Sequence, residues 1–185
     1  NVCDAGVKIE PKIALLMCSA IISDTLIFRS PTCTEMDREA GKALAEIAGI
    51  NIKEHAHEMF FAGSNISEKT AKELFTGDFK RFSIGDTTFG IGQVSCMDGE
   101  ELDQVKKKVM TYMKEQYKSL GVNMLYFMLT DIIKPGTELL CVGDGAMELV
   151  ERAFGVQGSD DVVYLPGVVS RKKQVVPEIM MEITQ

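Results

Sequence analysis

Three consecutive cations near the C-terminus, Arg171, Lys172 and Lys173, are the strongest candidates for chemistry in this sequence. They follow directly from residues 168–169, which predict a short strand, and side chains alternate along a strand. We therefore expect Arg171 and Lys173 on one face and Lys172 on the other. Arginine offers a planar fork for two phosphate oxygens and lysine a compact charge, so the cluster indicates a site for a small phosphate-rich anion. A solvated basic edge that discourages strand aggregation explains the same residues equally well.

Asp24 is a candidate metal ligand because it ends one apolar stretch and is followed at once by another. We expect such a carboxylate to be poorly hydrated, and an unpaired buried charge is very costly. A base, several hydrogen-bond donors or a metal ion would have to neutralise it. Position alone favours the simpler alternative, a capping or hydrogen-bonded structural aspartate.

Lys69 lies where the first turn of a short helix is expected, with Ser67 as its cap. The helix dipole disfavours a cation there, unless an anion binds at the same helix end. Taken alone, the residue is better explained as a solvated surface lysine. The two histidines, His55 and His57, are two positions apart on a predicted helix and do not face each other, so a metal that they share is not expected.

Composition bounds the class of protein. The chain has 185 residues, 45% of them hydrophobic, which is typical of a globular protein with a real core. No apolar run approaches the roughly 20 residues of a membrane span, so no membrane partner is expected. A net charge of -7 makes the chain a poor general binder of nucleic acid. Five cysteines without a C-x-x-C pair favour a reducing cytoplasm. Because the chain begins with Asn1, we take it as a C-terminal or processed piece.

Two regions differ in their patterns. Residues 1–63 predict helices only: an apolar helix opened by Pro11 that should be buried, a second with a Thr34–Asp37 capping box that ends at Gly49, and a third from Asn51. Residues 64–185 predict strands and helices together. Their elements are a short helix, a hairpin at 82–89, a helix at 102–121, a central strand at 124–133, a strand at 138–142, a helix at 146–154, and strands at 162–165 and 168–169. The fold class expected is α/β, with a helical remnant followed by a mixed sheet flanked by helices.

Two long segments carry a family resemblance. Residues 19–26, SAIISDTL, and 28–34, FRSPTCT, resemble the last metal-site motif of family II inorganic pyrophosphatases, manganese-dependent members of the DHH phosphoesterase superfamily. Residues 167–177, GVVSRKKQVVP, resemble the substrate-binding signature of the same family's C-terminal domain. The resemblance covers essentially the whole chain. It implies that residues 1–63 end a DHH metal-binding domain and that residues 64–185 form the substrate-binding domain.

The resemblance implies roles for four residues. Asp24 would ligate a metal, and Arg171, Lys172 and Lys69 would grip substrate phosphate and act in catalysis. The family's Ser-Lys-Lys-like segment is Ser67-Glu68-Lys69 here, so Glu68 replaces its first lysine. The histidines and aspartates of the family's N-terminal metal motifs are absent from these residues. We therefore expect the chain by itself to be incomplete and inactive.

The function implied is hydrolysis of inorganic pyrophosphate to two phosphates at a centre of two or three metal ions. The cofactor would be Mn²⁺, with Mg²⁺ or Co²⁺ as alternatives, because carboxylate and imidazole ligands suit such ions. The full protein would be a cytoplasmic homodimer whose small-molecule partner is pyrophosphate. Three alternatives remain open: another phosphoesterase of the superfamily, acting on polyphosphate or nucleotides, an anion-binding fragment without activity of its own, and a structural domain with an exposed basic edge.

Overall fold

The computed structural model describes residues 8–63, 66, 68–96 and 99–185, and the chain divides into two compact units, Asn1–Gly63 and Ser64–Gln185. The first unit is helical and the second is built on a sheet. Each is described by itself. The α/β class expected from the sequence is confirmed, with a mixed sheet flanked by helices in the second unit.

In its described residues, 8–63, the first unit has three helices: α1 (Pro11–Asp24), α2 (Glu35–Ala48) and α3 (Ile52–Gly63). The predicted capping box of α2 is present, because Thr34 and Asp37 exchange hydrogen bonds between their side chains and backbone N–H groups. Its small core is drawn from all three helices: Ala14, Cys18, Ile22, Leu44, Ala45 and Ala56. Burial raises the pKa of the Cys18 thiol, in keeping with a packing role.

Helix α1 is not buried on all sides, contrary to the expectation from its apolar composition. Ala14, Cys18 and Ile22 are fully covered, whereas Leu16 keeps 67% of its surface exposed and Ile13 keeps 50%. Among the described residues of this unit, the helices that pack against α1 are α2 and α3, and two helices cover only part of its circumference.

The second unit contains one five-stranded sheet in the order β1-β2-β3-β4-β5. The strands are β1 (Lys80–Ile84), β2 (Thr87–Cys96), β3 (Met124–Asp131), β4 (Gly136–Val142) and β5 (Val162–Pro166). Only β2 and β3 are parallel. They are connected by α5 (Gly99–Gln116), which is the long crossover that a parallel pair requires.

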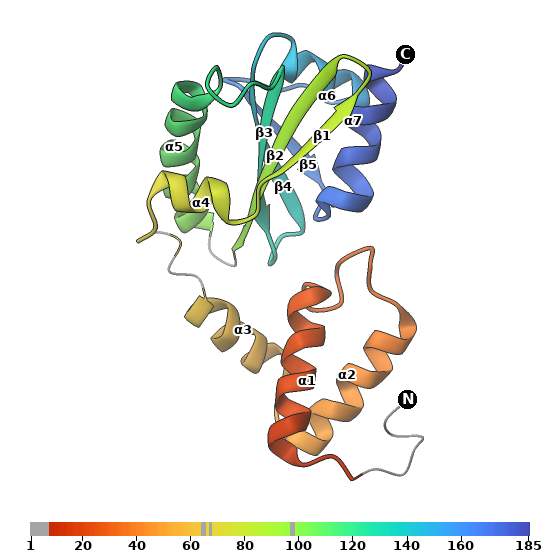
Figure 1. The fold of residues 1–185 in the computed structure, drawn as a ribbon. Coiled ribbons are helices and arrows are strands. Elements are labelled where there is room, and N and C mark those ends of the chain that lie inside the picture. The colour runs from red at the N-terminus through yellow and green to blue at the C-terminus, as the bar shows by residue number, and fades with distance from the viewer. Residues whose placement is uncertain (1–7, 64–65, 67, 97–98) are drawn as a thin grey trace. The chain divides into compact units, whose positions relative to one another are not determined.

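Helices cover both faces of this sheet (Figure 1). Helices α4 (Ala71–Gly77) and α5 pack on one face, and α6 (Ala146–Phe154) and α7 (Val176–Ile183) on the other. Residues 124–130 of β3 are all buried, as expected for a central strand. Among the described residues, no helix is both long and apolar enough to cross a membrane.

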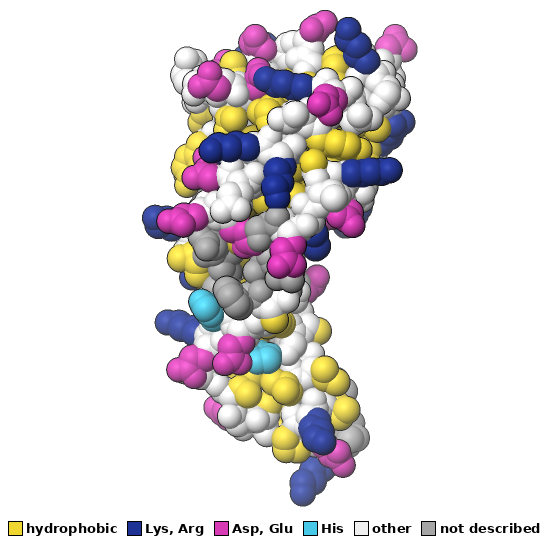
Figure 2. Space-filling model, turned by 90° about the vertical axis from the view of Figure 1, so that its left-hand side faces the viewer, with side chains coloured by type: hydrophobic (Ala, Val, Ile, Leu, Met, Phe, Trp, Pro, Cys, Tyr) yellow, Lys and Arg dark blue, Asp and Glu magenta, His cyan; other side chains and the backbone are white. Residues whose placement is uncertain are grey.

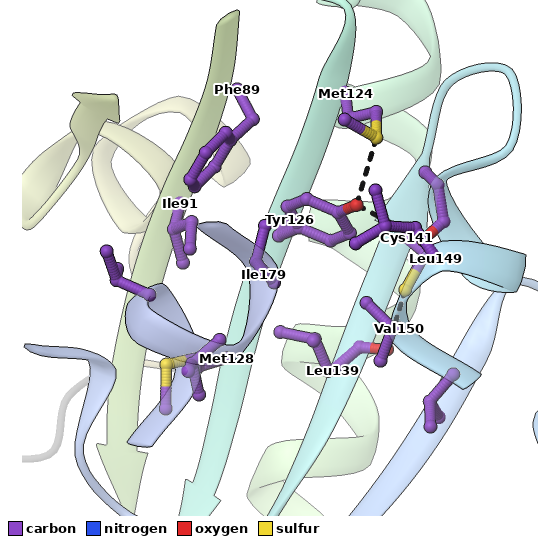
Figure 3. Packing of buried hydrophobic residues seen from close by; sticks show 14 of the residues in the cluster. Phe89, Ile91, Met124, Tyr126, Met128, Leu139, Cys141, Leu149, Val150 and Ile179 are labelled. Carbon is purple, nitrogen blue, oxygen red and sulfur yellow. Dashed lines mark hydrogen bonds between the residues drawn. The ribbon is translucent and has the colours of Figure 1, made fainter. Parts of the chain in front are cut away.

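The core against α6 and α7 is centred on Tyr126, as Figure 3 shows. Its ring is fully buried, and its hydroxyl donates a hydrogen bond to the backbone oxygen of Ala146 at 3.1 Å. Burial raises the pKa of the phenol far above its ordinary value, and it does the same for the thiol of Cys141. Both groups are therefore neutral and serve packing.

Two predicted elements differ from the structure. Residues 168–169 do not form a strand, because Gly167 has a φ of +73° and turns the chain away after β5. Helix α5 ends at Gln116, and a turn carries the chain on to Gly121, where the sequence pattern placed the helix end.

Candidate functional site

The three cations lie on a single π-helical turn, Arg171–Val175, which leads directly into α7. The expectation that they alternate along a strand is wrong. Arg171 is buried, whereas Lys172 and Lys173 are both exposed. The reason is the turn itself, because a helical backbone directs successive side chains around an axis instead of to opposite faces. One cation is therefore buried in the unit and its two neighbours are exposed.

The guanidinium of Arg171 is held by two segments far away in sequence. Nη1 donates to the backbone oxygens of Asp78 at 2.6 Å and Ile91 at 3.2 Å, and Nη2 donates to Oδ1 of Asp78 at 2.8 Å. Its side chain is only 8% exposed, against 43% for Asp78. Buried ion pairs persist when further hydrogen bonds satisfy their remaining polar atoms, and the two carbonyl oxygens do so here.

The loop before the turn is shaped by Gln174. Its Oε1 accepts from the backbone N–H groups of Val169 and Ser170, both at 3.0 Å, and its Nε2 donates to the oxygen of Gly167 at 3.2 Å. The hydroxyl of Ser170 caps the turn by accepting from the N–H of Lys173. Side chains of the motif therefore fix the backbone that presents its cations.

Strand β4 anchors the same loop through a buried threonine pair. The hydroxyl of Thr137 donates to the oxygen of Val168 at 2.6 Å and takes a hydrogen bond from Thr130 Oγ1 at 2.9 Å. Both threonines are almost completely buried. The turn that carries Arg171 and Lys172 is thus fastened to the centre of the sheet.

Lys69 lies just before α4 and is exposed. The predicted cap, Ser67, lies outside the described residues, and the observed N-cap is Thr70 in a capping box with Glu73. Hydrogen bonds from the N–H and hydroxyl of Thr70 lower the pKa of the Glu73 carboxyl, and the charge of Lys69 lowers it further. Asp78 follows α4, so Lys69 and the partner of Arg171 lie at opposite ends of this seven-residue helix, which is about 10 Å long.

Asp24 is the last residue of α1 and is exposed. The expectation of a poorly hydrated carboxylate is therefore wrong, since the apolar residues that flank Asp24 in the sequence do not cover it. The C-terminal end of a helix carries partial negative charge, and the last turn of α1 contains no basic residue. A carboxylate at this position favours a nearby cation.

The chain directly after Asp24 is strained. Leu26, Ile27 and Phe28 have φ values of +49°, +57° and +62°, the left-handed region that residues with a Cβ atom avoid. Each costs about 1–2 kcal/mol relative to ordinary backbone. Three in a row form one left-handed turn that brings the backbone of residues 29 and 30 back to the oxygen of Thr25.

Side-chain contacts offset this strain. The buried hydroxyl of Thr25 donates to the oxygen of Ile21 at 2.6 Å and accepts from the N–H of Phe28 at 3.1 Å. Arg38 of α2 donates to the oxygen of Phe28 at 2.8 Å. The Phe28 ring lies so close to Gly41 that a Cβ there would approach its Cζ to 2.7 Å. The turn next to Asp24 is consequently fixed by α2.

The described residues contain no group of three or more His, Cys, Asp or Glu side chains that could hold a metal ion. His55 instead contacts Ser19, with Nε2 at 2.7 Å from Oγ. The hydroxyl of Ser19 already donates to the oxygen of Leu15, so it accepts from the imidazole and is not arranged as a nucleophile.

Four residues were singled out in the sequence. Arg171 and Lys172 lie on one turn. Lys69 lies at the opposite end of α4 from Asp78. Asp24 belongs to the first unit. Asp78, Gln174 and Thr137 were not predicted as contributors. Only Gln174 carries a signal in the sequence, since it lies within the 167–177 motif, whereas Asp78 and Thr137 act through contacts far apart along the chain.

The chain is similar to a known domain family and to a solved structure. The DHHA2 domain family matches residues 57–181. A Methanococcus jannaschii protein assigned to the family II inorganic pyrophosphatases has a crystal structure that superposes with a TM-score of 0.82 at 41% identity, covering 97% of this chain and 58% of that one.

Three relatives are similar over nearly the whole chain. A probable manganese-dependent inorganic pyrophosphatase of Clostridium acetobutylicum is 45% identical, covering 97% of this chain and 58% of that protein. A cobalt-dependent inorganic pyrophosphatase of Clostridium perfringens is 44% identical, covering 97% and 32%. A manganese-dependent inorganic pyrophosphatase of Methanocaldococcus jannaschii is 43% identical, covering 93% and 56%. The chain thus spans between about a third and three fifths of the length of these relatives.

Proposed function

Because this chain belongs to the DHHA2 domain family, we propose that it forms part of an enzyme that hydrolyses inorganic pyrophosphate to two phosphates. Its relatives are named for that reaction and for manganese or cobalt. The observation that carries the proposal is the π-helical turn after β5, on which buried Arg171 stands beside exposed Lys172. Such a turn offers one oriented fork and one exposed ammonium to a small anion.

Arg171, Lys172 and Lys69 are the substrate-binding and catalytic residues of this proposal. Hydrolysis breaks one P–O–P bond by addition of water, and negative charge accumulates on the leaving phosphate. Fixed cations stabilise that charge more than the charge of the bound substrate, which is how they accelerate the reaction. Lys172 suits this role because its ammonium group is exposed and hydrated, so a bound phosphate can replace that water and contact the charge directly.

Asp24 is the proposed metal ligand of this chain. Manganese prefers oxygen ligands in an octahedral arrangement, so one carboxylate supplies about one of six positions. The described residues do not by themselves fit a whole manganese centre, since Asp24 has no cluster of further ligands around it. The other ligands of a Mn²⁺ or Co²⁺ centre would come from residues other than those described. The fixed left-handed turn after Asp24 supports its role as a rigidly held ligand.

Titration calorimetry with pyrophosphate in metal-free, low-salt buffer tests the anion site. We expect Lys172→Ala to weaken binding about tenfold, which corresponds to the loss of one charged contact. Lys118→Ala is the matched control, because Lys118 is an exposed lysine beyond the end of α5. Equal effects of the two substitutions would show only general attraction between charges and would contradict the proposal. Titration with tripolyphosphate separates a pyrophosphate site from one built for longer chains.

Phosphate release measured with Mn²⁺ tests the metal part of the proposal. We expect the 185-residue chain to bind pyrophosphate without hydrolysing it, because its described residues provide a single candidate ligand. Turnover by this chain that survives Asp24→Asn would show that Asp24 is not a ligand of the catalytic metal.

We also propose a cytoplasmic homodimer that does not bind nucleic acid. Four cysteines are free thiols in the described residues, which suits a reducing compartment. Figure 2 shows cations and carboxylates interspersed on the visible face of the second unit, whereas nucleic-acid binding requires a basic patch or stripe. The exposed Leu16 and Ile13 of α1 leave apolar surface for a further contact. Light scattering on the purified protein measures the oligomeric state.

A further inference from the structure

Asp78 is the residue outside both family-like motifs that most directly shapes the anion site. It follows α4 and precedes β1, and it lies 93 positions before Arg171 in the sequence. Its backbone oxygen and its carboxylate each accept a hydrogen bond from the same guanidinium. Among the described residues, no other side chain forms a hydrogen bond with the guanidinium of Arg171.

The partners of Arg171 can be counted atom by atom. An arginine side chain has five N–H groups, one on Nε and two on each Nη. Both groups of Nη1 are taken by backbone oxygens, of Asp78 and Ile91, and one group of Nη2 is taken by Oδ1 of Asp78. The Nε–H and the second Nη2–H make no hydrogen bond within the described part of the chain. These two groups can form one edge of the guanidinium, the kind of fork that matches two oxygens of a phosphate.

We propose that Asp78 is a positioning residue for pyrophosphate: its carboxylate fixes Nη2 of Arg171 so that the remaining Nε–H and Nη2–H edge is presented to a phosphate group. This inference rests on the proposed function, in which Arg171 contacts the substrate. The two carbonyl oxygens alone hold only Nη1, so the guanidinium could rotate and tilt about that end. The carboxylate adds the second point that fixes the plane of the fork.

Long-range electrostatics alone predicts the opposite effect of Asp78 on pyrophosphate binding, so the two explanations can be separated by experiment. Asp78 carries a negative charge beside a site for an anion, so a charge acting only at a distance would weaken pyrophosphate binding. Removing that charge would then tighten binding whatever residue replaced it. Positioning predicts instead that the outcome depends on whether the replacement can still accept a hydrogen bond from Nη2.

Two substitutions at Asp78 separate these effects, because both remove the charge. Asp78→Asn keeps an oxygen that can accept from Nη2, and Asp78→Ala keeps none, while the two carbonyl contacts of Arg171 are backbone contacts that both variants retain. By calorimetry with pyrophosphate in metal-free, low-salt buffer, we expect Asp78→Ala to bind about tenfold more weakly. Asp78→Asn should bind as tightly as the original chain or more tightly. Asp86→Ala, at an exposed aspartate of the β1–β2 turn, is the control for loss of charge.

The Arg171→Ala background distinguishes failure of this inference from failure of the proposed function. If Arg171→Ala weakens pyrophosphate binding and Asp78→Ala does not, the positioning role is wrong and the anion site stands. If neither Arg171→Ala nor Lys172→Ala changes binding, the anion site itself is wrong. In the Arg171→Ala background, Asp78→Ala should have no further weakening effect, because it acts through that side chain.

A spectroscopic measurement keeps the test independent of variant stability. The Nε–H resonance of Arg171 in the unmodified chain should shift when pyrophosphate is added, because this group is predicted to contact the ligand. The same shift should occur in Asp78→Asn. An unchanged Arg171 resonance at saturating pyrophosphate would overturn the inference even if Asp78→Ala failed to fold.

Discussion

The two units differ in how far they bury the charged residues of their candidate sites. The first, three helices around a small core, leaves Asp24 exposed at a helix end. The second, a five-stranded sheet covered on both faces, buries Arg171 and surrounds it with acceptors from two other segments. A sheet with connecting loops brings backbone oxygens from distant positions to one point, whereas a short helical bundle keeps its carbonyls within its own helices. Burying a charge therefore requires the longer-range architecture.

The units also differ in where rigidity comes from. Near Asp24, three left-handed residues are held by Thr25, Arg38 and the space at Gly41. Near Arg171, Gly167 is the one residue of 167–175 with a positive φ, and rigidity comes from Gln174 and the buried Thr130–Thr137 pair. The first site stores strain, and the second is fastened by hydrogen bonds. Substitutions can test whether this contrast is real.

Phe127→Ala should have the largest effect on stability and should be confined to the second unit. The ring is fully buried in β3, and its removal costs about 3–5 kcal/mol of the free energy of unfolding. All four tyrosines lie in residues 64–185, so tyrosine fluorescence during urea denaturation reports this unit, while circular dichroism reports both. An equal loss of unfolding free energy in the helical transition of residues 1–63 would show that the two units do not unfold separately.

Gly41→Ala should destabilise the first unit by about 1–3 kcal/mol, because its new Cβ meets the Phe28 ring and displaces the left-handed turn. Replacing glycine by alanine inside a helix ordinarily stabilises the fold, so a loss of stability here would indicate the clash with Phe28. Gly77→Ala is the control in the second unit, since a Cβ there meets nothing within 4 Å and φ is not positive. The two changes should have opposite signs by thermal melting. A stabilised Gly41→Ala would contradict the close packing of the turn.

Two buried threonines allow the same chemical change in both units. Thr25→Val leaves the N–H of Phe28 without a partner, although the oxygen of Ile21 keeps its hydrogen bond from the N–H of residue 25. Thr137→Val removes the hydrogen bond to the oxygen of Val168. Each should cost about 1–2 kcal/mol in urea denaturation. Only Thr137→Val should also weaken pyrophosphate binding, because it loosens the loop before Arg171. Equal pyrophosphate affinity in both variants would show that this loop does not depend on β4.

The smallest expected effect is a loss of stability at low pH, and it should be similar in the two units. Each contains a capping box, Thr34–Asp37 or Thr70–Glu73, in which the threonine backbone and hydroxyl lower the pKa of the carboxyl. A lowered pKa stabilises the fold above the carboxyl's unfolded value, about 4, and this stability is lost as pH falls through the folded value. Melting temperatures measured from about pH 5 to pH 2 should fall less steeply in Thr34→Ala and Thr70→Ala. Unchanged slopes would indicate that the boxes are open in solution.

Local patterns predicted much of the fold because their causes are local. The Thr34–Asp37 box, the end of α2 at Gly49 and the hairpin before β2 depend on residues a few positions apart. The buried strand β3 was predicted from an unbroken apolar run, which requires cover on both faces. The family resemblance, drawn from two motifs, is confirmed for the DHHA2 domain.

Predictions failed where the backbone geometry of a turn decides the outcome, because residue composition does not reveal that geometry. A short apolar pair at 168–169 has the composition of a strand, but Gly167 and Gln174 bend it into a loop. The apolar residues around Asp24 in the sequence suggested a poorly hydrated carboxylate, but Asp24 is exposed at the end of α1. Ser67 was expected to cap α4, and Thr70 does so.

The sequence by itself determined which side chains could hold an anion or a metal, the order of the elements, and the family. Those properties follow from residue chemistry and short spacings. Only the tertiary structure decided that Arg171 is buried and Lys172 is not, and that Asp78, 93 positions away, holds the guanidinium. No local pattern carries that pairing, because hydrogen bonds between distant segments form only after the sheet has brought the loops together.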